Sequence, residues 1–210
     1  SDVCSSDLGN SVDKLIDAQK EQIYFMPLYL PFASKKQLDI IVANSKENLF
    51  FMSDFLLFKD YLYAWRYMGR FEKPDFASYT YQGFSLQWLL GKAYKESNQS
   101  YFYYAILMER AIMRMKELDV DICLFVDWFE NQSYDKSVYY AMHQYYPEAK
   151  VHGYMGFIAD STIFPHIIAS NKELFCHIAP KDIYLCSSYL LKFYQNYNGY
   201  KHIAQIGRAH

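Results

Sequence analysis

The sequence has no run of basic residues, and its formal net charge is −2 at pH 7. Proteins that bind nucleic acid or an anionic membrane through charge carry a basic surface, and this composition gives no indication of one. No apolar stretch approaches the roughly 18 residues that a membrane-spanning helix requires. These absences favour a globular protein with neither nucleic acid as a partner nor a transmembrane anchor.

Cysteine is also scarce, with four in the chain, and Cys4 lies in an unusual terminal segment. The spacing of Cys123, Cys176 and Cys186 fits neither a zinc site nor a disulfide framework. Cys123 and Cys186 lie in apolar runs, so we expect both to be small buried residues in a reducing, cytoplasmic setting. The histidine spacing suggests no metal site either.

The two ends of the chain are related through the DNA that can encode them. Residues 2–8 can be encoded by GAC GTG TGC TCT TCC GAT CT, and the reverse complement of that stretch encodes residues 206–210 in one frame. One short element can therefore supply both ends in opposite orientations, which resembles a sequencing adapter. We expect residues 1–8 and 206–210 to be non-native and to pack against nothing, and the natural protein to extend beyond both ends.

What the sequence does have is apolar and aromatic residues, at 52% and 20% of the chain. Residues 9–119 read as mostly helical, with helices predicted over 54–71, 85–95 and 100–118. The third has the clearest helical period. Its predicted apolar stripe is Tyr101, Tyr104, Ala105, Met108, Ala111, Ile112, Met115 and Leu118. Its predicted solvent-facing side is Glu109, Arg110, Arg114, Lys116 and Glu117.

Residues 120–205 differ from the mostly helical first part, because short apolar runs alternate with helical patterns. Strands are predicted over 120–126, 150–154, 183–187 and 202–205, with helices over 134–146 and 188–196. The run 120–126 reads as a strand buried on both faces. This rhythm predicts an α/β fold with a Rossmann-like parallel sheet, in which ligands bind beyond the carboxyl ends of the strands.

The first candidate site lies at such an end and packs two acids and two amides into residues 127–132. Glu130 is the preferred general base, with Asp127 as the second choice, and Trp128 or Phe129 can stack on a sugar face. The amides of Asn131 and Gln132 both donate and accept hydrogen bonds, which suits a polyol. A helix N-terminus follows and attracts anions through its free N–H groups. The alternative is that the segment is only a capping turn with solvated acids.

The second candidate site follows the next predicted strand. Gly153, Tyr154 and Gly156 begin a turn in which glycine allows the backbone to approach a ligand closely. A dinucleotide-binding fingerprint requires a third glycine, so an epimerase-like cofactor site is not favoured, and no cofactor is expected. The alternative is again a purely structural turn.

Taken in order, several short segments are similar to bacterial surface-carbohydrate biosynthesis proteins, the glycosyltransferase-like proteins of O-antigen and capsule loci. Met155 stands where that family has Gln. The segments are Trp128-Phe-Glu-Asn-Gln132, Asp135, Tyr146-Pro147, Gly153-Tyr-Met-Gly-Phe157, Pro165 and Pro180-Lys-Asp-Ile183.

The resemblance implies a GT-B architecture, in which two Rossmann-like domains face each other across a cleft. This chain would supply the acceptor-side domain, and the donor-binding domain would be missing. The implied partners are a nucleotide-sugar donor and a glycan or lipid-linked acceptor, at the inner face of the cytoplasmic membrane. The rival interpretation is a non-catalytic α/β module whose aromatic helices, at 55–67 and 101–108, bind partner proteins or the membrane surface.

Overall fold

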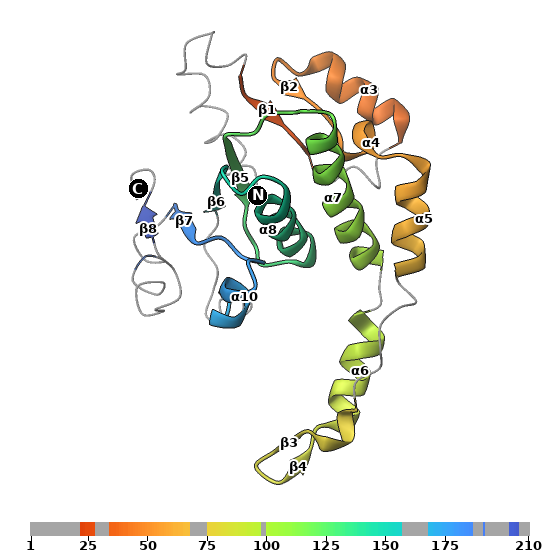
Figure 1. The fold of residues 1–210 in the computed structure, drawn as a ribbon, viewed down its shortest axis with the longest axis vertical. Helices are drawn as coiled ribbons and strands as arrows, with labels where there is room; N and C mark the ends of the chain where they lie inside the picture. Colours follow the sequence, from red (N-terminus) through yellow and green to blue (C-terminus); the bar gives the residue numbers. More distant parts are fainter. Residues whose placement is uncertain are drawn as a thin grey trace.

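The computed structural model describes residues 22–27, 34–67, 75–97, 100–156, 168–186, 191 and 202–205. The fold is mixed α/β, as predicted, and its largest sheet has four parallel strands in the order β5-β6-β7-β8 (Figure 1). Helix α8 (Ser133–Tyr145) connects the first two strands, as parallel pairing requires. The strands are β5 (Leu124–Trp128), β6 (Lys150–Met155), β7 (Asp182–Leu185) and β8 (His202–Gln205).

One face of this sheet packs on α8, and α8 in turn packs on α7 (Ser100–Glu117). The stripe predicted for α7 is confirmed at its centre, because Met108, Ile112 and Met115 are buried against Val138 and Met142 of α8. A second cluster lies between α8 and the strands. It comprises Phe129, Tyr139, Met155, Ile168, Ala169, Leu174, Ala179, Ile183 and Leu185. The short helix α10 (Asn171–Phe175) contributes Leu174 to it.

Two predictions for α7 are wrong. Leu118 is 64% exposed, because the helix ends at Glu117 and Asp119 turns the backbone with a φ of 56°. Arg114, predicted to face solvent, is buried. The reason is a charged partner on another helix, which helical periodicity cannot reveal.

That partner is Asp60 on α5 (Phe58–Tyr67), whose side chain is fully buried. Arg114 donates through Nε to Asp60 Oδ2 at 2.9 Å and through Nη2 to Oδ1 at 2.8 Å. Arg110 Nε donates to Oδ1 at 3.0 Å, and the Leu57 backbone N–H donates to Oδ2 at 2.9 Å. Burial alone raises the pKa of Asp60, but these four hydrogen bonds outweigh it and lower the pKa to about 2.

The first predicted helix is also wrong, because residues 54–71 do not form one helix begun by Asp54. Helix α4 (Met52–Phe55) comes first, and Asp54 lies inside it, accepting from the Phe51 N–H at 2.8 Å. The chain breaks at Leu56 before α5 starts, because Leu56 has extended backbone angles. Helix α3 (Lys35–Asn44) and a two-strand parallel pair, β1 (Tyr24–Phe25) with β2 (Asn48–Leu49), precede these helices.

Strand β5 is parallel as predicted, but it is not buried on both faces. Leu124 and Val126 are 50% and 52% exposed, whereas Phe125 packs against residues of α7 and α8 and Asp127 is buried. The strand also starts later than predicted, so Cys123 falls outside it and is exposed rather than buried. Cys186, just after β7, is partly buried.

A separate arm projects away from the sheet and its helices (Figure 1). It consists of the 3-10 helix η2 (Phe76–Ser78), the hairpin of β3 (Thr80–Tyr81) and β4 (Phe84–Ser85), and helix α6 (Gln87–Ser97). Phe76 and Tyr94 meet edge to face with ring centroids 5.7 Å apart, which ties η2 to α6. The helix predicted over 85–95 corresponds to α6, shifted by two residues.

The expectations for residues 1–8 and 206–210 and for the helix over 188–196 fall outside the described residues, apart from Leu191. Within the described part of the chain, no helix is long and apolar enough to cross a membrane.

Candidate functional site

The two segments singled out in the sequence leave the same edge of the sheet. Strands β5 and β6 are parallel neighbours, with Asp127 opposite Gly153 and Trp128 opposite Tyr154. Their carboxyl ends therefore lie side by side, as expected for a Rossmann-like sheet. Because side chains alternate between faces along a strand, Trp128 and Tyr154 share one face, and Asp127 and Gly153 share the other.

On the first of these faces, the Glu130 carboxylate lies between two donors. Trp128 Nε1 donates to Glu130 Oε1 at 2.8 Å, and Gln132 Nε2 donates to Oε2 at 2.6 Å. The Trp128 and Tyr154 rings meet edge to face, with centroids 5.7 Å apart. A partly exposed carboxylate fixed beside two aromatic rings can bind hydroxyl groups and accept a proton.

Gly156 completes this cluster because a side chain there would collide with the aromatic rings. A Cβ added to Gly156 would lie 2.6 Å from the Trp128 ring and 2.8 Å from the Tyr154 ring. The glycine therefore allows both rings to pack over the end of β6. Its role in the described structure is to seat the aromatic pair.

The β5–α8 loop is held by Asp135, a residue that was not among the predicted site residues. Asp135 Oδ2 accepts from the backbone N–H groups of Glu130 and Gln132, each at 2.9 Å. Asn131 between them has a φ of 57°. The anion position at this helix N-terminus is thus occupied by the protein's own carboxylate. The sequence signal was available, since an acid at the third position of a helix commonly accepts from the capping residue.

Asp127 lies on the other face of the sheet and is 95% buried, since its exposure is 5%. Burial and then the like charge of Asp135 raise its pKa, and the Tyr139 hydroxyl only partly opposes this. The pKa of Asp135 is also raised by burial, but the two backbone N–H groups favour its charged form. We infer that Asp135 carries the charge of the pair and that Asp127 holds a proton at neutral pH.

The raised pKa of Asp127 predicts how the stability of the protein changes with pH. Folded Asp127 keeps its proton above the unfolded value of about 3.9, so the free energy of unfolding should fall as pH rises from about 4. Replacing Asp127 with Asn should make this decline less steep. The slope of the free energy of unfolding against pH should change by up to about 1.4 kcal/mol per pH unit, the value for one proton. Urea denaturation of both proteins from pH 5 to pH 8 measures the two slopes.

The exposed Asp121 provides the matched control, because Asp121→Asn removes a carboxylate from a solvated position just before β5. That variant should keep the wild-type slope. Parallel pH profiles for the wild type and Asp127→Asn would show that Asp127 does not retain its proton.

The sequence predicted that Gly153 lets the backbone approach a ligand, and this prediction is wrong. A Cβ at this position would lie 2.7 Å from Pro180 Cγ and 3.2 Å from Phe129 Cβ. The space above Gly153 is therefore filled by the loop that precedes β7 and by the start of the β5–α8 loop. Gly153 permits close packing inside the protein, and it does not join the cluster around Glu130.

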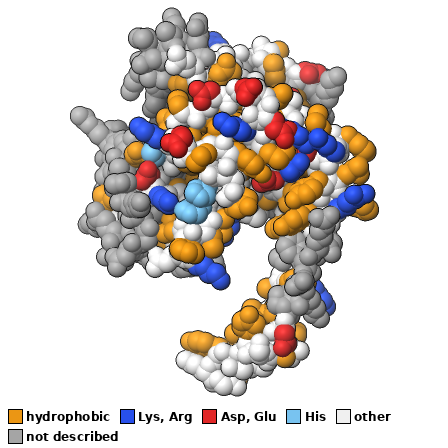
Figure 2. Space-filling model, in the orientation of Figure 1, with side chains coloured by type: hydrophobic (Ala, Val, Ile, Leu, Met, Phe, Trp, Pro, Cys, Tyr) orange, Lys and Arg blue, Asp and Glu red, His pale blue; other side chains and the backbone are white. Residues whose placement is uncertain are grey.

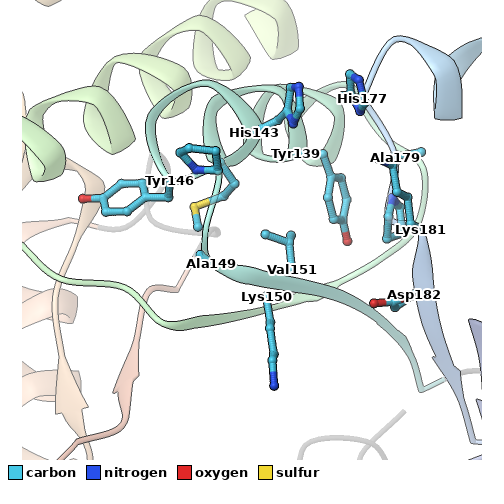
Figure 3. A pocket seen from close by; sticks show the side chains of 13 residues that line it. Tyr139, His143, Tyr146, Ala149, Lys150, Val151, His177, Ala179, Lys181 and Asp182 are labelled. Atoms are coloured by element: carbon cyan, nitrogen blue, oxygen red, sulfur yellow. The ribbon is translucent and has the colours of Figure 1, made fainter.

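A pocket lies at the opposite, amino-terminal edge of the sheet, between α8, β6 and the segment before β7 (Figure 3). Its volume is about 230 Å³, and Tyr139, Lys150, Lys181 and Asp182 are among its lining residues. His143 and His177 stack at its rim with ring centroids 3.7 Å apart. Burial, His143 and Lys181 together lower the pKa of His177. Sequence spacing gave no sign of this pair.

The structure therefore gathers Trp128, Glu130, Gln132, Tyr154 and Gly156 into one cluster and separates Asp127 and Gly153 from it. Asn131 shapes the loop through its backbone. Among the described residues, no group of three or more His, Cys, Asp or Glu side chains is placed to hold a metal ion. In comparisons with family models, curated proteins and solved structures, nothing matches this chain.

Proposed function

We propose that this chain is the acceptor-side part of a glycosyltransferase-like enzyme of bacterial surface-polysaccharide synthesis. The observation that carries the proposal is the Glu130 carboxylate, held by Trp128 and Gln132 at the carboxyl edge of a parallel sheet. The order of short motifs that resembles the surface-carbohydrate family supports the same class. A GT-B arrangement, with the nucleotide sugar bound by a second domain, is part of this proposal.

In this proposal Glu130 acts as the general base. An acceptor hydroxyl gives its proton to the carboxylate while its oxygen forms a bond to the anomeric carbon of the donor sugar. The bond from that carbon to the nucleoside diphosphate breaks, and the diphosphate leaves with the electron pair. Trp128 and Tyr154 would pack against the apolar face of the acceptor sugar, since aromatic rings have an apolar body with a polar edge. Asp127 would not touch the substrate, and it would act by positioning the loop.

Titration calorimetry on residues 9–205 provides a direct test. The chain should bind acceptor-type oligosaccharides in the millimolar range and nucleotide sugars weakly or not at all, because the donor-binding domain is expected elsewhere. Trp128→Ala should abolish the oligosaccharide binding, whereas Trp65→Ala, at an exposed tryptophan of α5, should leave it unchanged. Micromolar binding of a UDP- or CDP-sugar would overturn the assigned domain role.

A non-catalytic interaction module is the second candidate, and exposed aromatic side chains favour it. Phe58 and Trp65 of α5 are among the most exposed large apolar residues of the described chain. On this proposal the chain would bind a protein partner, and sugar binding would be absent in the same titrations. The calorimetry therefore separates the two candidates.

A further inference from the structure

The projecting arm presents an aromatic surface that no other described element covers. Its hairpin turns through Gln82 and Gly83, whose φ values of 48° and 83° are typical of a tight type I′ turn. Tyr81 pairs with Phe84 across the two strands, and the Tyr79 carbonyl accepts from the Leu86 N–H at 2.9 Å. Because side chains alternate along a strand, these four residues share one face of the ribbon.

This face and the start of α6 are open to solvent. Tyr79, Tyr81, Phe84 and Trp88 are 52%, 63%, 76% and 75% exposed. The other face of the hairpin carries the small polar side chains Thr80 and Ser85. Figure 2 shows hydrophobic side chains on the arm, while most charged side chains in that view lie on the body of the molecule.

The charge pattern of the arm indicates what covers it. Residues 76–91 contain no Asp, Glu, Lys or Arg; Asp75 precedes them, and Lys92, Lys95 and Glu96 follow. Lys92 Nζ lies over the Trp88 ring, 5.6 Å from its centroid, so a cation lies beside the aromatic surface. An uncharged tip rich in Tyr and Trp with lysines behind it matches the interfacial zone of a bilayer, where lysine stems extend toward the headgroups.

We propose that this arm inserts its hairpin tip and the first turn of α6 into the surface of a phospholipid bilayer. Tyr79, Tyr81, Phe84 and Trp88 enter the headgroup–acyl boundary, and Lys92 and Lys95 meet the phosphates. Insertion is driven by the aromatic side chains, which agrees with the lack of a basic run in the chain. The inference rests on the arm alone and is independent of the sugar-binding proposal.

Co-sedimentation of the full 210-residue chain with vesicles tests this. Binding to phosphatidylcholine vesicles is expected, with a modest increase when phosphatidylglycerol is included. The double variant Phe84→Ser and Trp88→Ser should bind at least about tenfold more weakly, because burial of one large aromatic side chain is worth more than a factor of ten. Trp88 fluorescence, isolated by changing Trp65 and Trp128 to Phe, should shift to the blue on binding.

Phe175→Ser is the matched control, because Phe175 is 82% exposed but lies on α10 in the body. It should leave vesicle binding unchanged. Absence of co-sedimentation with either vesicle overturns the proposal, as does an equal loss in the Phe175 control. Light scattering without lipid provides a further test. If the chain self-associates and the Phe84 and Trp88 double variant does not, the aromatic surface binds a second copy of the chain, and this result also overturns the proposal.

Discussion

Changing Glu130 to Gln is expected to lower glycosyl-transfer turnover by roughly a hundredfold or more, with little loss of stability. The substitution removes the charge that accepts the proton but keeps the size of the side chain. The oxygen of the new amide can still accept from Trp128 Nε1, and the exposed Gln132 amide can rotate to receive the new NH₂ group. The measurement is steady-state transfer by a protein that carries this chain together with the proposed donor-binding domain.

Two comparisons make this result specific to the charge. Gln132→Ala removes one of the two donors to Glu130 while keeping the carboxylate, so it should reduce turnover far less. Thermal melts of both variants should match the wild type. Full activity in a well-folded Glu130→Gln protein would remove Glu130 from the mechanism.

Removing the Asp60 carboxylate should cost about 3–5 kcal/mol of folding free energy, a large share of the roughly 5–15 kcal/mol that is usual for a domain. Asp60→Ala leaves Arg114 buried without its partner and deprives Arg110 of its acceptor. It also removes the acceptor for the Leu57 N–H at the start of α5. Urea denaturation at neutral pH measures the loss directly.

Glu117→Gln is the matched control, because Glu117 pairs with the same Arg114 but is 51% exposed. Exposed ion pairs contribute about 0–1 kcal/mol, so this variant should lose little. A loss in Asp60→Ala no greater than that of Glu117→Gln would show that the buried network does not hold α5 on α7.

The same network predicts the acid side of the stability profile. The pKa of folded Asp60 is lowered to about 2, so its contribution is complete above the unfolded value near 3.8 and is lost as pH falls through about 2. Asp127 acts in the opposite direction, since its raised pKa makes folding less favourable as pH rises from about 4. Together the two groups favour maximal stability in mildly acidic solution.

Local sequence pattern determined much of the α/β organisation. The helical period over 100–118 predicted α7 almost to the residue, and the strands of the main sheet lie within a few residues of the predicted ones. It also placed Trp128 and Tyr154 at the same edge, because consecutive parallel strands bring their carboxyl ends together. These features follow from local patterns and from the pairing of consecutive strands.

Tertiary structure alone decided which polar residues are buried and what each one contacts. Arg114 looked like a solvent-facing residue until α5 brought Asp60 against it across 54 positions of sequence. Gly153 looked like a ligand-facing glycine until Pro180 filled the space above it. Asp127 was the second candidate for the base after Glu130, and only the folded chain shows that it is buried on the opposite face of the sheet. The hydrophobic periodicity of a segment indicates which of its residues face the core and which face solvent. The partner of a buried charge or the neighbour of a glycine comes from a distant segment, so only the folded chain shows it.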